Sequence, residues 1–161
     1  MKRLLFILPF LVVNFLFSCK GKQETVEKYN YLLVDKNGKE IPLPKNKIIF
    51  INFMAYSCSA CMKELPLLKK VLSEKQYRDK VAFIGCVIDA DKNDLSDKNF
   101  PFYSCNKANF VRFPVPGTPT TYIISPDGKK LIVVYGAFTE ENLRKFLDKA
   151  IKKYYSLKRE K

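Results

Sequence analysis

The sequence predicts an α/β fold, a mixed β-sheet flanked by helices, from the order of three kinds of segment. An apolar run at residues 47–54 passes directly into a segment with leucines at helical spacing, and a second apolar run follows at 81–88. Residues 120–135 predict a β-hairpin around the turn Ser125-Pro-Asp-Gly128, and an amphipathic helix follows Thr139. This order builds a central sheet with both parallel and antiparallel pairs.

Turn residues and helix caps predict the shorter segments. Asn37-Gly38 is a preferred two-residue turn, so residues 31–43 predict an N-terminal β-hairpin extension to the sheet. Residues 89–99 are polar and predict a loop or a short helix, and residues 100–104 predict a short edge strand. Thr139 is expected to cap the last helix, because its hydroxyl accepts from an amide of the first turn that has no other partner.

Two cysteines, Cys58 and Cys61, stand where the first long strand passes into its helix. The backbone amides and the dipole at a helix N-terminus favour an anion, and the thiolate is the reactive form of cysteine. Cys61 lies one turn later on the same side, so the two sulfurs are able to form a ring. This context favours a redox-active dithiol over a purely structural bridge.

A zinc site is a second alternative for this pair, and the composition argues against it. The chain has no histidine and no second closely spaced cysteine pair, so Cys86 and Cys105 would have to supply the missing ligands. No bound metal is therefore expected. For Cys86 and Cys105 we favour two free, buried thiols, which pack as small apolar side chains. A bridge between them requires Cα atoms within about 7 Å.

Residues 1–18 predict a lipoprotein signal peptide. Lys2 and Arg3 precede an apolar stretch that is shorter than the roughly 20 residues of a membrane span. Ser18-Cys19 resembles the lipobox of bacterial lipoproteins, in which the cysteine is lipidated and becomes the first residue of the mature protein. The alternatives are an ordinary signal peptide or a short uncleaved anchor. Each of the three places the domain outside the cytoplasm, where disulfides persist.

The remaining boundaries follow from this assignment. Residues 19–29 are expected to be the lipidated cysteine and a polar tether, 30–155 a single domain, and 156–161 a basic tail. The formal net charge is +13, but the lysines are scattered along the chain. An exported domain also does not share a compartment with genomic DNA, so no nucleic-acid partner is expected. The charge fits a solvated surface, or one that rests on anionic lipid headgroups. No feature predicts an obligate dimer, and a monomer is expected.

Taken together, these features resemble the thioredoxin fold, and more narrowly the exported TlpA/ResA-type thiol-disulfide oxidoreductases. The resemblance covers roughly residues 30–152. Its carriers, in chain order, are the Asn37-Gly38 hairpin, Asn52-Phe53, Cys58, Cys61, Glu64, Pro66, Gly117-Thr118-Pro119-Thr120-Thr121 and the Ser125-Pro-Asp-Gly128 turn. The chain departs from the family in having Ser57 before the first cysteine, where an aromatic residue is usual, and in lacking tryptophan.

The resemblance implies roles for particular residues. Cys58 would be the nucleophile that forms a mixed disulfide with the substrate, and Cys61 would resolve it. Glu64 would manage protons at the inner thiol, the alternative being a solvated helix glutamate. Pro119 would be cis and face the cysteines, and the backbone of Thr118 would pair with the substrate chain.

The predicted function is therefore an exported, membrane-anchored thiol-disulfide oxidoreductase without a cofactor. It is expected to reduce disulfides of envelope proteins with electrons from a membrane donor. The alternatives are a redox-inert binding module with a structural Cys58–Cys61 bridge and a thiol peroxidase. The chain lacks the pattern of proline and threonine before a single cysteine that the peroxidase branch carries. A copper carrier on this fold would need histidine, which is absent.

Overall fold

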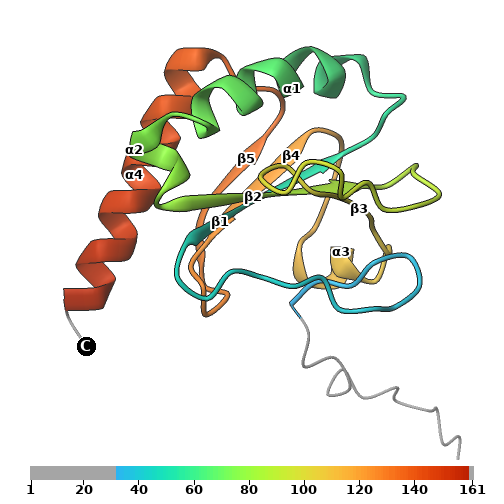
Figure 1. Ribbon diagram of the computed structural model, residues 1–161, viewed down its shortest axis with the longest axis horizontal. Coiled ribbons are helices and arrows are strands. Elements are labelled where there is room, and N and C mark those ends of the chain that lie inside the picture. Colours follow the sequence, from blue (N-terminus) through green and yellow to red (C-terminus); the bar gives the residue numbers. More distant parts are fainter. Residues whose placement is uncertain (1–31, 160–161) are drawn as a thin grey trace, which may run out of the picture.

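The computed structural model describes residues 32–159 and contains one five-stranded sheet with helices on both faces (Figure 1). The elements, in chain order, are β1 (Ile48–Met54), α1 (Ser59–Leu72), α2 (Lys75–Arg78), β2 (Val81–Val87), β3 (Phe102–Ser104), α3 (Asn109–Arg112), β4 (Thr120–Ile124), β5 (Lys130–Tyr135) and α4 (Glu140–Arg159). All these elements lie inside the described part of the chain.

The sheet is mixed, as the sequence predicts, with the strand order β3-β2-β1-β4-β5. β2 runs parallel to both β1 and β3, whereas β4 runs antiparallel to β1 and β5. β1 lies at the centre, and every one of its residues is buried. The sheet therefore brings the carboxyl ends of β1 and β2 to the same edge, where α1 begins.

The hydrophobic core has two halves, one on each face of the sheet. Because side chains alternate along a strand, Phe50 of β1 packs with Leu68 and Leu147 under helices α1 and α4. Its neighbour Ile51 packs on the opposite face with Leu33 and with aromatic residues near α3. Figure 1 shows α1 and α4 together on one side of the sheet, with α3 and the first described residues on the other. Residues 32–159 thus contain both halves of this core.

The predicted N-terminal hairpin is present but narrower than expected. Val34 bridges Glu40, and Gly38 takes a positive φ of 77° in the turn, as Asn-Gly predicts. The pairing stops at Ile41, whose amide donates to the carbonyl of Leu33. Proline follows at positions 42 and 44, and neither has an amide to continue the ladder. The predicted hairpin is therefore confirmed as a chain reversal, and in the described residues its pairing is confined to Leu33–Ile41.

The segments between the long strands and the last helix largely follow the sequence pattern. Residues 89–99 form a loop without a helix, and β3 is the edge strand expected within 100–104. Thr139 caps α4, since its hydroxyl accepts from the amide of Asn142. α4 continues to Arg159, so the prediction of a tail from residue 156 is wrong for residues 156–159. The predicted signal peptide, Cys19 and tether lie outside the described residues.

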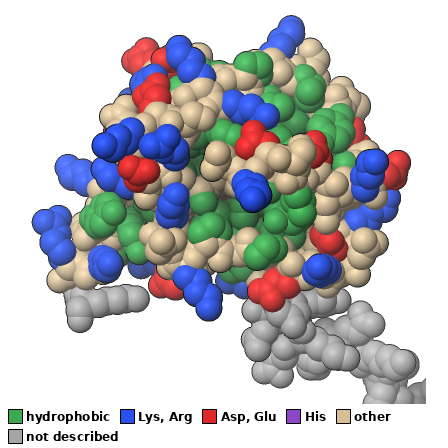
Figure 2. Space-filling model, viewed as in Figure 1, with side chains coloured by type: hydrophobic (Ala, Val, Ile, Leu, Met, Phe, Trp, Pro, Cys, Tyr) green, Lys and Arg blue, Asp and Glu red, His purple; other side chains and the backbone are tan. Residues whose placement is uncertain are grey.

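Between residues 32 and 159, no helix has the length and apolarity needed to cross a membrane. Lysine and arginine side chains are spread over the face seen in Figure 2, with apolar patches between them. This distribution agrees with the scattered lysines of the sequence.

Candidate redox-active site

Cys58 and Cys61 are joined by a disulfide at the edge of the sheet where β1 ends and α1 begins. Their Cα atoms lie 5.3 Å apart. Cys58 is the N-cap residue of α1, with an extended backbone, and its sulfur accepts from the amide of Cys61 at 3.2 Å. A helix N-terminus leaves amides without partners in the helix, so a sulfur in this position is stabilised as an anion once the bridge is reduced.

The two cysteines differ in how far solvent reaches them. Cys58 is partly exposed, between Ser57 and Ser59, which are both exposed. Cys61 is only 1% exposed and belongs to the core under α1. A partner disulfide is therefore able to approach the sulfur of Cys58, and the sulfur of Cys61 is reached only from within the protein.

The loop before β4 forms the wall opposite Cys58. The peptide bond between Thr118 and Pro119 is cis, as the family resemblance implies. The carbonyl oxygen of Thr118 lies 3.5 Å from Sγ of Cys58. The next residues are fixed, because the Thr120 hydroxyl donates to the carbonyl of Gly117 and the Gly136 amide donates to that of Pro119. Thr118 is partly exposed beside the bridge, and Pro119 is buried.

Glu64 lies inside the protein, one helical turn beyond Cys61, with 4% of its surface exposed. The alternative of a solvated helix glutamate is therefore wrong. Its two oxygens accept from the side-chain amide of Asn52 at 3.1 Å and from the backbone amide of Phe138 at 2.9 Å. Burial raises the pKa of Glu64, and these two hydrogen bonds, which favour the ionised form, offset only part of that effect.

Asn52 links Glu64 to the sheet beneath the site. This side chain is 1% exposed, and its amide also donates to the hydroxyl of Thr121 at 3.0 Å. Thr121 pairs with Asn52 across β1 and β4, and it follows the cis-proline loop by two residues. A single buried network therefore connects α1, the central strand and the strand after the loop.

Asp89 is a site residue that the sequence does not reveal. It follows β2, and its carboxylate accepts from the amides of Tyr56 at 2.8 Å and Ser57 at 2.9 Å, directly before Cys58. Partial desolvation acts to raise the pKa of Asp89, but the hydrogen bonds from Ser57 and Tyr56 outweigh it and hold that pKa below its usual value. The signal available was an acid at the carboxyl end of a strand parallel to β1.

Cys86 and Cys105 form a second disulfide, with Cα atoms 5.3 Å apart. The prediction of two free thiols is therefore wrong. Cys86 lies on β2, and Cys105 follows β3, two residues beyond Tyr103, the residue that pairs with Cys86. The four cysteines thus form two separate bridges. Among residues 32–159, no group of side chains is arranged to hold a metal ion.

Comparisons with known proteins agree with this geometry. Residues 34–151 match the family model of the thioredoxin-like domain. The thiol-disulfide oxidoreductase ResA of Bacillus cereus is 31% identical over 83% of this chain and 82% of its own length. ResA of Bacillus subtilis is 27% identical over 88% and 84%. The crystal structure of StoA from Bacillus subtilis shares the fold, with a TM-score of 0.52 at 19% identity over 72% of this chain and 94% of that one.

The family match covers most of the chain, and the partly exposed Cys58, the buried Cys61 and the cis-proline loop lie together in one site. The chain therefore belongs to the thioredoxin-like family and is a thiol-disulfide oxidoreductase of the ResA type.

Proposed function

We propose that this oxidoreductase is exported, anchored to a membrane through lipidated Cys19, and reduces disulfides of envelope proteins. The observation that carries the proposal is the asymmetry of the Cys58–Cys61 bridge. One sulfur is partly exposed at a helix N-terminus, and the other is buried behind it. This is the arrangement that attack from outside and resolution from inside require.

The exchange runs in two steps. In the reduced enzyme the Cys58 thiolate attacks one sulfur of the partner disulfide, which forms a mixed disulfide and releases the first partner thiolate. Cys61 loses its proton and attacks Sγ of Cys58, so the mixed disulfide breaks and the second partner thiolate leaves. The partner gains two electrons, its thiolates take up protons, and the enzyme ends with the Cys58–Cys61 bridge.

Glu64 is proposed to accept the proton that Cys61 must lose. The carboxylate is buried one turn from that cysteine, and its raised pKa brings its proton affinity closer to that of a thiol. Asn52 and the Phe138 amide fix both oxygens, which orients the group without help from solvent.

Thr118 and Pro119 are proposed to hold the substrate chain. Thr118 is partly exposed, and its carbonyl lies beside Cys58, so its backbone is placed to pair with an extended peptide. Main-chain pairing depends little on side-chain identity, so the site would accept disulfides in different sequence contexts. The expected partners are disulfide-containing envelope proteins together with a membrane donor that returns the electrons, and the protein is expected to act as a monomer.

A redox titration of residues 20–161 tests this function, because that segment includes every described element and both halves of the core. The protein is equilibrated in thiol buffers of defined potential, alkylated, and read by peptide mass. A Cys58–Cys61 potential near or below roughly −220 mV supports a reductant fed by a donor, whereas roughly −120 mV supports a disulfide-forming oxidant. A bridge that never titrates while the domain stays folded supports a redox-inert binding module.

A further inference from the structure

β2 is paired along only part of its outer edge. β3 is short and covers the carboxyl-terminal half of β2, where Gly85 pairs with Phe102 and Val87 with Ser104. No strand among residues 32–159 pairs with this edge at Val81–Ile84. Val81 lies opposite Ile48, at the start of β1, and Cys58 follows the end of β1. The open edge is therefore at the other end of the sheet from the redox site.

The register shows which backbone groups face outward there. In a parallel pair, the amide and carbonyl of one residue point to the same side, and successive residues alternate. The Gly85 amide donates outward to Pro101, and the Val87 carbonyl accepts from Cys105. Val81 and Phe83 are separated from Gly85 by an even number of positions, so their amides and carbonyls face the same outer side as those of Gly85. No group between residues 32 and 159 forms a hydrogen bond to them.

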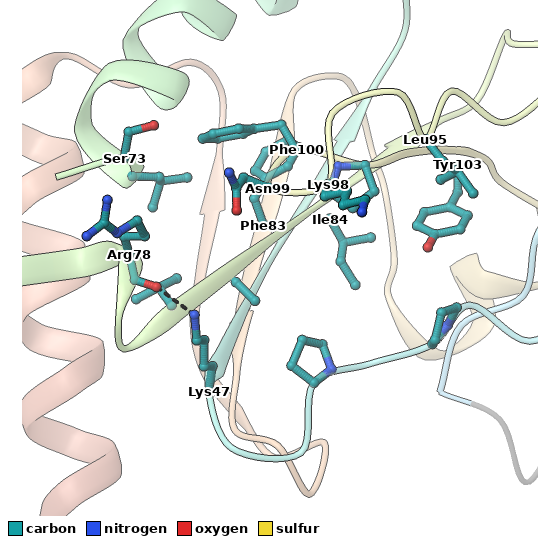
Figure 3. Close-up of a pocket in the computed structure, with 16 residues that line it drawn as sticks. Lys47, Ser73, Arg78, Phe83, Ile84, Leu95, Lys98, Asn99, Phe100 and Tyr103 are labelled. Atoms are coloured by element: carbon teal, nitrogen blue, oxygen red, sulfur yellow. Dashed lines mark hydrogen bonds between the residues drawn. The ribbon is translucent and has the colours of Figure 1, made fainter. Parts of the chain in front are cut away.

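A cavity of about 430 Å³ lies along this open edge. Figure 3 shows Phe83, Ile84, Phe100 and Tyr103 around it, with Lys47 and Arg78 at one end. Because side chains alternate along β2, the apolar walls come from both faces of the sheet, Phe83 from one and Ile84 from the other. An extended chain placed here would find a pocket for its side chains on either side.

The charged side chains that line the cavity all have one sign. Lys47, Arg78 and Lys98 line it, and no aspartate or glutamate does. The ammonium of Lys47 donates to the carbonyl of Arg78, which holds that charge at the end of the groove, as the dashed line in Figure 3 marks. Arg78 also pairs with Asp79 at 3.6 Å, with more than half of each side chain exposed.

From the unpaired edge, the two apolar walls and the cationic rim, we propose that this groove binds an extended acidic segment of a partner protein. The segment adds a strand beside Val81 and Phe83, alternate side chains enter the apolar walls, and its carboxylates face the lysines and Arg78. A second copy of this chain fits poorly, because it brings the same excess of positive charge to the same edge. The binding is distinct from the redox cycle and uses no cysteine.

Amide hydrogen exchange, measured by NMR on oxidised protein of residues 20–161, tests the pairing directly. The probe is a short, end-blocked peptide of alternating valine and glutamate. When the peptide nearly saturates the protein, the amides of Val81 and Phe83 should exchange about tenfold more slowly than in the free protein. The amide of Ala82 already faces β1 and should not change, so it serves as the internal control. Because no redox reaction is measured, the result does not depend on the proposed reductase function.

A charge reversal tests the rim. Lys98→Glu should weaken the acidic peptide about threefold to tenfold, in line with the loss and reversal of one exposed charge pair. Lys152→Glu makes the same change at an exposed position of α4 that does not line the groove, and it should leave the affinity unchanged.

Several results would overturn the proposal. The first is an unchanged exchange rate at Val81 and Phe83 with millimolar peptide, and the second is equal binding of a peptide with lysine in place of glutamate. Protection of these amides by phosphatidylglycerol vesicles in place of the peptide would assign the groove to lipid. Protection that grows with protein concentration alone would assign it to a second copy.

Discussion

The second disulfide provides a quantitative prediction about stability. In a Cys58→Ala, Cys61→Ala variant, the Cys86–Cys105 bridge is the one disulfide left among the described residues. Unfolding this variant in urea with dithiothreitol and refolding it in the same reductant opens the bridge without truncating either side chain, so no cavity is created. Any change in the free energy of unfolding reports the bridge itself.

The size of the effect follows from the loop that the bridge closes. Its cysteines are separated by 19 residues in the sequence. Closing such a loop removes about 11 cal/mol/K of entropy from the unfolded chain, which is about 3 kcal/mol at 25 °C. For a domain of this size, the loss corresponds to a fall in Tm of roughly 10 °C. The Cys58–Cys61 loop has a separation of only 3 and is worth about half as much by the same relation.

Urea unfolding of this variant, followed by circular dichroism with and without dithiothreitol, measures the difference. Alkylation and mass analysis establish that the bridge is closed in one sample and open in the other. A matched variant that also carries Cys86→Ala and Cys105→Ala should show no effect of dithiothreitol. A difference below about 1 kcal/mol between the closed and open bridge would refute the reasoning from loop closure.

Three further predictions concern the site, two at Glu64 and one at Asp89. Glu64→Gln should slow resolution by Cys61 at least tenfold and leave the first attack by Cys58 nearly unchanged, measured by quenched-flow trapping of the mixed disulfide. Because burial raises the pKa of Glu64, the wild-type protein should lose stability as pH rises from the pKa of this group in the unfolded chain through its higher pKa in the folded protein. Glu64→Gln should remove this pH dependence of stability. An unchanged pH dependence would contradict the assignment. Asp89→Ala should cost about 1–2 kcal/mol in urea unfolding, because two hydrogen bonds from backbone amides to this exposed carboxylate are lost. Asp89→Asn keeps one acceptor oxygen, so its stability should lie between those of the wild type and Asp89→Ala. Equal stability of all three proteins would show that these two hydrogen bonds do not stabilise the fold.

The long strands were predictable because their burial is visible in the local sequence. β1 and β2 are central and buried on both faces, so each is a continuous apolar run. The same logic found β4 and β5 from the turn between them. The sequence pattern overestimated the length of pairing in the N-terminal hairpin. The Asn-Gly turn determines where the chain reverses but not how many residues pair on either side of it. The prolines at positions 42 and 44 decide that length.

The site was predictable where its chemistry is local in sequence. Cys58 and Cys61 are three residues apart on one helix, so spacing and the strand before them suffice to place them together. Asp89 acts on amides more than thirty positions earlier, and an aspartate at the start of a polar loop is ordinary in sequence. The hydrogen bonds of Asp89 to these amides depend on the parallel pairing of β1 and β2, which brings both strand ends to one edge.

Sequence alone also fails to separate a buried thiol from a buried disulfide, because both satisfy the same apolar environment. The register decides the matter here: Cys86 pairs with Tyr103, and Cys105 is two residues further on the same face. The exposed fractions of these two cysteines are 0% and 6%, and neither stands at a helix N-terminus as Cys58 does. A partner thiolate must reach a sulfur to exchange with it. The enzyme is therefore able to turn over one disulfide repeatedly while the other keeps β2 joined to the end of β3.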